Sequence, residues 1–121
     1  MATEAMDKLA VRKAIHSCLY ELDQDVQWYL RRTADQMNNS SRKETVSYVL
    51  SQVIDAQVRM LAPVTPHICE ELWEKKGGRG FVALGSWPTP DFDKVDVKAE
   101  ESENLIENLI EDTQNIIKAT S

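Results

Sequence analysis

The stretch LAPVTPHICEELW, residues 61–73, decides where one helix of this chain ends and where the next begins. Pro63 ends the earlier helix, because the residue before a proline is pushed out of the α region. Thr65 then suits the N-cap, and Pro66 suits the first helical position, where no amide hydrogen is needed. Gly77-Gly78 terminates the new helix, whose apolar face is formed by Ile68, Cys69, Leu72 and Trp73. We therefore expect two helices that meet at a proline corner.

The helix before this corner is predicted to begin after a polar linker, residues 36–40, and to end at Leu61. Its start resembles a capping box, in which the Ser41 hydroxyl and the Glu44 carboxylate satisfy exposed amides. One face of the helix is apolar and consists of Val46, Val49, Leu50, Val53, Ile54, Met60 and Leu61.

A first helix is predicted from about Glu4 to Thr33. Its apolar residues recur at spacings of three and four and share one face: Val11, Ile15, Cys18, Leu19, Leu22, Val26, Tyr29 and Leu30. Such a helix would be roughly 45 Å long and needs partners along most of that length, which a bundle supplies.

The C-terminal third is predicted to be irregular from Phe81 to Asp93, with a short extended piece at Phe81–Leu84, because Trp87-Pro88 and Pro90 preclude a helix. A last helix is expected from about Val97 to Ala119. Its stripe is wide enough to close a four-helix core and consists of Leu105, Ile106, Leu109, Ile110, Thr113, Ile116 and Ile117. The fold class is therefore all-α, a four-helix-type bundle with an irregular segment before the last helix. A length of 121 residues suits one domain.

The net charge of −6 is distributed unevenly. Residues 1–80 carry 11 basic and 11 acidic residues, whereas residues 81–121 carry 3 and 9. A nucleic acid would have to approach the first two-thirds, because the acidic C-terminal segment repels phosphate. No apolar run approaches the roughly 20 residues that span a bilayer, and the N-terminus lacks the pattern of a signal peptide. Cys18 and Cys69 are expected to be buried reduced thiols, which favours the cytoplasm.

Several motifs invite a catalytic or metal hypothesis, but each has a plainer structural explanation. His16-x-Cys18 and His67-x-Cys69 do not form a zinc site, because helical residues two apart point about 200° away from each other. Carboxylates early in a helix, as in residues 70–74, are favoured by the helix dipole. Residues 77–80 lack the spacing of a phosphate loop and indicate a helix C-cap and a turn. We predict no catalytic residue and no metal ligand, and the basic clusters by themselves favour a solvated surface.

The whole block at residues 61–73 resembles the L-A-P-[FV]-x-P-H-[IL]-x-E-E-L-W block of the anticodon-binding domain of class I tRNA synthetases for leucine, isoleucine, valine and methionine. Phe81-Val82 and Ser86-Trp87-Pro88 match the same family. Two segments resemble the leucyl-tRNA synthetase of archaeal or eukaryotic type: Val11–Ala14 followed by Asp25–Arg32, and the helix from Glu100 to Ala119. Lys76-Gly77-Gly78 departs from the usual Leu-Gly at that corner.

The resemblance implies that residues 1–121 are the anticodon-binding bundle of a larger synthetase that attaches leucine to tRNA(Leu) with ATP and Mg. The fragment itself would hold no cofactor, because the His-Ile-Gly-His and Lys-Met-Ser-Lys-Ser type motifs are absent. Phosphate and shape contacts to tRNA are expected from six basic residues: Arg12, Lys13, Arg31, Arg32, Arg42 and Lys43. The other expected partners are further domains of the same chain. We expect no membrane partner, and we expect the fragment to be monomeric.

The sequence leaves two alternatives open. The first is the same domain from a valine or isoleucine enzyme, in which the anticodon bases are read directly. The second is a stand-alone helical module that binds protein through the stripe at residues 105–117, and a large exposed apolar patch would favour it.

Overall fold

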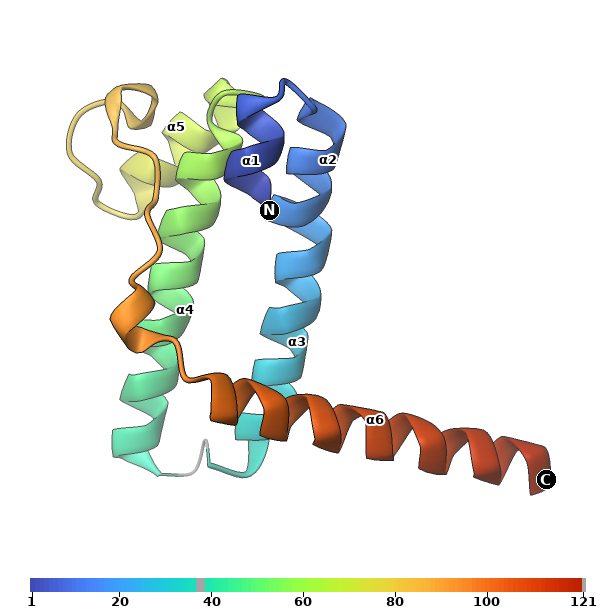
Figure 1. Cartoon of the computed structure of the whole chain (residues 1–121). Helices are drawn as coiled ribbons and strands as arrows, with labels where there is room; N and C mark the ends of the chain where they lie inside the picture. Colours follow the sequence, from blue (N-terminus) through green and yellow to red (C-terminus); the bar gives the residue numbers. More distant parts are fainter. Residues whose placement is uncertain (37–38, 121) are drawn as a thin grey trace. The chain divides into compact units, whose positions relative to one another are not determined.

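The computed structural model describes residues 1–36 and 39–120. Every regular element in these two ranges is helical and none is a strand, which confirms the all-α class and the helical bundle. The chain divides into two compact units, Met1–Pro88 and a second unit from Thr89 onward, and each is described by itself. Figure 1 shows the course of the helices within each unit.

The prediction of one continuous first helix is wrong, because the helix is interrupted. It forms α1 (Ala2–Asp7), α2 (Val11–Ile15), a π-helical segment (His16–Glu21) and α3 (Leu22–Thr33). The interruption lies at Leu9, whose φ of 53° places a non-glycine residue in the left-handed region. The Leu9 amide donates to the Met6 carbonyl at 2.9 Å and the Ala10 amide to the Ala5 carbonyl at 2.8 Å. These two bonds are those of a Schellman motif, which reverses the chain so that α1 packs beside α2.

The π-helical segment joins α2 to α3 without a break and contacts α4. The Gln57 side chain in α4 (Ser40–Leu61) donates to the Cys18 carbonyl at 3.0 Å. Cys18 itself is buried. One hydrogen bond and one buried thiol therefore tie the middle of the first rod to the second half of α4.

Helix α4 ends at Leu61 as predicted, but its N-cap differs from the prediction. The cap is Asn39, whose side-chain oxygen accepts the Ser41 amide at 3.1 Å. Asn is as good a cap as Ser, so the helix begins one residue upstream of the predicted cap. The predicted capping box at Ser41 and Glu44 is therefore wrong.

The proline corner holds the core of the first unit. Helix α5 (Pro66–Lys75) has Pro66 at its first turn and Thr65 at its N-cap position, as predicted. The Thr65 hydroxyl makes no cap; it donates to the Leu61 carbonyl at 3.2 Å. The core contains Val58 from α4, Ala62 just after it, Cys69 from α5 and Val82, with Leu61 and Trp73 packed against them.

The segment after α5 contains a 3₁₀ turn, Val82–Leu84, where the sequence predicted an extended piece. The cause is Glu70 on α5. Its carboxylate accepts the Val82 amide at 2.9 Å and the Ala83 amide at 3.0 Å, which are the first two amides of the turn. A partner twelve residues away therefore supplies the cap that local sequence does not.

The second unit contains a 3₁₀ turn, Phe92–Lys94, and the long helix α6 (Val97–Thr120), close to the predicted bounds. Asp96 caps α6, since its carboxylate accepts the Lys98 amide at 3.0 Å and the Ala99 amide at 3.2 Å. The role of the α6 stripe in closing a four-helix core stays a prediction.

Candidate functional site

The six predicted RNA-contacting residues lie in two separate places on the first unit. Arg31 and Arg32 are in the last turn of α3, and Arg42 and Lys43 are in the first turns of α4. The two helix ends lie at the same end of the α3–α4 hairpin, as Figure 1 shows. We name these four residues the hairpin tip. Arg12 and Lys13 are in α2, about 28 Å from Arg31 along a continuous helical rod at 1.5 Å per residue.

The hairpin tip is a basic stretch of an acidic chain. Residues 31–44 carry four basic residues and two acidic ones, Asp35 and Glu44, so this stretch has a charge of +2 within a chain of −6. All four basic residues of the tip are exposed. The Arg31 guanidinium lies 5.8 Å from the centre of the Trp28 ring, one helical turn earlier, which places an aromatic ring beside the basic cluster.

The two halves of the tip differ in their relation to the helix dipole. Arg31 and Arg32 lie near the negative end of α3, where cations are stabilising. Arg42 and Lys43 lie near the positive end of α4, where cations are destabilising. The first turn of α4, which the structure describes in full, holds no acidic residue. The helix dipole therefore does not account for cations at Arg42 and Lys43.

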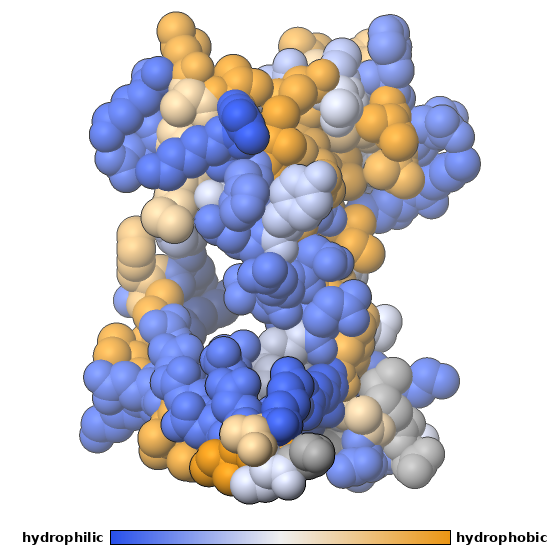
Figure 2. Space-filling model, turned by 90° about the vertical axis from the view of Figure 1, so that its right-hand side faces the viewer, coloured by the Kyte–Doolittle hydropathy of each residue, from blue (hydrophilic) through white to orange (hydrophobic). Residues whose placement is uncertain are grey.

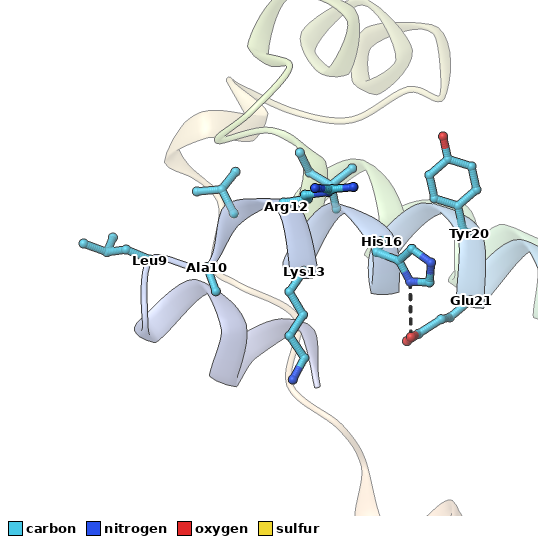
Figure 3. A pocket seen from close by; sticks show the side chains of 9 residues that line it. Leu9, Ala10, Arg12, Lys13, His16, Tyr20 and Glu21 are labelled. Atoms are coloured by element: carbon cyan, nitrogen blue, oxygen red, sulfur yellow. Dashed lines mark hydrogen bonds and ion pairs between the residues drawn. The ribbon is translucent and has the colours of Figure 1, made fainter.

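Arg12 and Lys13 lie instead on an open groove with a volume of about 1160 Å³. Figure 3 shows this groove along α2 and the π-helical segment, with Leu9 projecting from the α1–α2 turn. Its lining is mainly apolar and aromatic, with Leu9, Val11, Ile15 and Tyr20 beside the charged residues. The structure thus separates this pair from the hairpin tip in environment as well as in position.

Carboxylates offset the charge of Lys13. The pKa of the Glu4 carboxylate lies below its usual range because of a hydrogen bond from Lys8 and, to a smaller extent, the charge of Lys13. The Ser17 hydroxyl, the His16 ring and the Lys13 charge, in that order, lower the pKa of Glu21. His16 Nδ1 lies 3.3 Å from Glu21 Oε1, a pair that the π-helical spacing of five residues brings together. Glu4 and Glu21 therefore lie close enough to Lys13 to interact with its charge.

The cysteines and histidines are not assembled into a site within the described residues. No group of three or more His, Cys, Asp or Glu side chains there could hold a metal ion. Cys18 and Cys69 are free and buried, as predicted, and burial raises the pKa of Cys18. His67 is exposed in the first turn of α5.

A network around Trp73 was not predicted and holds the corner between α4 and α5. Asp55 Oδ1 lies 2.6 Å from Lys76 Nζ, and Asp55 Oδ2 lies 3.0 Å from Arg59 Nε. Both cations face the Trp73 ring, Arg59 at 5.2 Å and Lys76 at 5.9 Å from a ring centre. The departure at Lys76-Gly77-Gly78 thus has a structural role, since Lys76 completes the network. The spacing of Asp55 and Arg59 indicates an i,i+4 pair, but only the folded corner brings Lys76 to it.

No helix in the described ranges combines the length and the apolar character that crossing a membrane requires.

Comparison with known proteins gives matches over nearly the whole chain. A family model described as the anticodon-binding domain of tRNA ligase matches residues 1–121. The leucine–tRNA ligase of Pyrococcus abyssi is 41% identical over 116 residues, which is 96% of this chain and 12% of that protein. The leucine–tRNA ligase of Archaeoglobus fulgidus is 41% identical over 118 residues, 98% of this chain and 11% of that protein. The leucine–tRNA ligase of Methanothermobacter thermautotrophicus is 36% identical over 117 residues, which is 97% of this chain and 12% of that protein. The chain therefore spans about an eighth of the length of the curated relatives it matches.

Proposed function

This chain belongs to the family of anticodon-binding domains of tRNA ligases, and from that premise we propose that it is the tRNA-docking bundle of a leucine–tRNA ligase. The relatives named above support the choice of leucine. The whole enzyme would attach leucine to tRNA(Leu) in the cytoplasm with ATP and Mg, and its catalytic groups would lie outside these 121 residues. The role of this bundle would be to orient the tRNA.

The hairpin tip is the proposed contact surface, and the observation that carries the proposal is the placement of Arg42 and Lys43 at the positive end of α4. Two cations at that end oppose the helix dipole, and a phosphate there would relieve the opposition. Arg31 and Arg32 extend the same surface from α3. Leucine tRNAs differ in their anticodons, so contacts to phosphate and helix shape suit them better than base reading. Arg12 and Lys13 remain predicted contacts of secondary weight.

The test uses the full ligase polypeptide that contains this chain. One variant replaces the four basic residues of the hairpin tip with alanine. A matched variant removes the same number of charges elsewhere, by alanine at Lys75, Lys94, Lys98 and Lys118. We expect the tip variant to bind tRNA(Leu) at least about tenfold more weakly at low salt, because each lost phosphate contact removes counterion release. The matched variant should bind nearly as well as the unchanged enzyme.

Two results would count against the proposal. Equal affinity of the tip variant and the unchanged enzyme would remove the hairpin tip from the interface. Charging of a valine or isoleucine tRNA with its own amino acid, in preference to leucine on tRNA(Leu), would assign the bundle to a different ligase.

A further inference from the structure

The groove beside α2 has features that RNA contact does not explain. Leu9 is 84% exposed although it is a large apolar residue, and Tyr20 is 60% exposed. Val11 is exposed beside them, and Ile15 is half-buried below. We name the apolar lining Leu9, Val11, Ile15 and Tyr20 the α2 groove. Figure 2, which views the first unit from the side of α2 and α3, shows hydrophobic groups gathered at the upper end among hydrophilic ones.

The backbone at Leu9 adds a second, independent observation. A φ of 53° is unfavourable for a branched side chain, and glycine is the usual residue at this position of a Schellman motif. The strain brings no burial within the described residues, because the side chain projects from the turn, as Figure 3 shows. Strain that persists at an exposed apolar residue points to a function for that side chain outside the fold itself.

The charges around the groove favour a protein occupant over a nucleic acid. Lys13 is accompanied by Glu4 and Glu21, and His16 faces Glu21 at 3.3 Å. A phosphate entering the groove would meet these carboxylates, whereas an apolar protein segment would bury Leu9 and Tyr20 and leave the charged rim in water.

We propose that the α2 groove docks an apolar segment from another domain of the same ligase polypeptide. The proposal rests on the proposed function, which places this chain in a larger enzyme, and on the finding that the matched relatives are about eight times longer than the aligned region. A tethered domain meets the groove at a high effective concentration, so a modest apolar patch suffices to hold it. Docking there would fix the direction of the α2–α3 rod, and with it the hairpin tip at the far end.

The test measures solvent access in the full ligase without tRNA. Leu9→Cys and Tyr20→Cys are made separately, with Ser51→Cys as the matched control, since Ser51 is an exposed position on α4. Both cysteines of this chain are buried, so they should react slowly with maleimide and add little background labelling. We expect maleimide to modify the two groove cysteines at least tenfold more slowly than the control. A photoactivatable maleimide at Leu9→Cys should cross-link to a peptide outside residues 1–121 of the same molecule.

Three results would overturn the docking proposal. Groove cysteines as reactive as the control would mean that the groove is open in the enzyme. Protection that appears only when tRNA(Leu) is added would assign the groove to RNA. Protection that disappears on dilution would assign it to a second copy of the ligase. All three results leave the affinity of the hairpin-tip variant for tRNA(Leu) to be measured separately, so failure here is distinguishable from failure of the proposed function.

Discussion

Two helices of the first unit end in the same backbone motif, and they do so with opposite residue choices. At the end of α5 the Gly77 amide donates to the Glu74 carbonyl at 2.9 Å and the Gly78 amide to the Trp73 carbonyl at 2.8 Å. At the end of α1, Leu9 and Ala10 make the equivalent pair of bonds. The left-handed residue is glycine in the first case and leucine in the second, with φ of 85° and 53°.

At the end of α5 the residue is the one that the backbone conformation favours. At the end of α1 it is a residue that this conformation disfavours. Gly77 at the end of α5 meets the conformational demand without strain, and Gly78 after it lets the chain approach Trp73 closely. Leucine at the end of α1 meets the same demand with strain and places an apolar side chain in solvent. The glycine position at the end of α5 concerns the stability of the corner between α4 and α5. The leucine position at the end of α1 concerns the α2 groove.

The largest effect is expected at Gly78, where a side chain has no room. A Cβ there would lie 2.3 Å from the Trp73 ring, which Arg59 and Lys76 flank. Gly78→Ala should lower the free energy of unfolding by about 2 kcal/mol, a typical cost of overpacking. Urea unfolding followed by circular dichroism measures this change. A loss below about 0.5 kcal/mol would show that the ring moves aside freely.

A smaller loss is expected at Gly77, where the demand is conformational only. A Cβ at this residue would meet nothing within 4 Å, but φ is 85°. Gly77→Ala should lower the free energy of unfolding by about 1 kcal/mol, since the left-handed region disfavours alanine. Gly77→Asn, which tolerates that region, should recover part of the loss in the same urea titration. Equal losses for the two variants would contradict a backbone cause.

The smallest effect, and one of opposite sign, is expected at Leu9. Leu9→Gly relieves about 1–2 kcal/mol of left-handed strain but adds unfolded-state entropy that offsets about 0.5–1 kcal/mol. The isolated chain should therefore become more stable by about 0.5 kcal/mol, whereas Leu9→Ala should leave its stability unchanged. Differential scanning calorimetry compares the three proteins. Clear destabilisation by glycine would mean that the leucine side chain contributes to the fold itself.

The sequence predicts the elements of this molecule best where proline and glycine limit the backbone. Pro63, Pro66 and Gly77 set the end of α4 and both ends of α5, because their preferences act locally. Leu9 carries no such signal, so the break between α1 and α2 was missed. The turn at Val82–Leu84 was missed for a different reason, since its cap is Glu70, which only the folded corner brings to it.

The candidate site could be predicted in residue type but only partly in arrangement. Four of the six basic residues flank the linker between α3 and α4, and a hairpin necessarily brings them to one end. That Arg12 and Lys13 belong to an apolar groove with nearby carboxylates depends on the α1–α2 turn, which the helical periodicity does not reveal. No sequence pattern distinguishes a basic side chain that is merely exposed to solvent from one that contacts phosphate.

The most direct test of the hairpin tip as the tRNA surface is the salt dependence of tRNA(Leu) binding by the full ligase. The slope of log affinity against log salt concentration counts the phosphate contacts, at about 0.7–0.9 per contact. If the tip makes the contacts, alanine at its four basic residues reduces the slope by about 3, and alanine at Arg12 and Lys13 changes it far less. An unchanged slope in the tip variant, or an equal reduction in the Arg12 and Lys13 variant, would contradict the proposed surface.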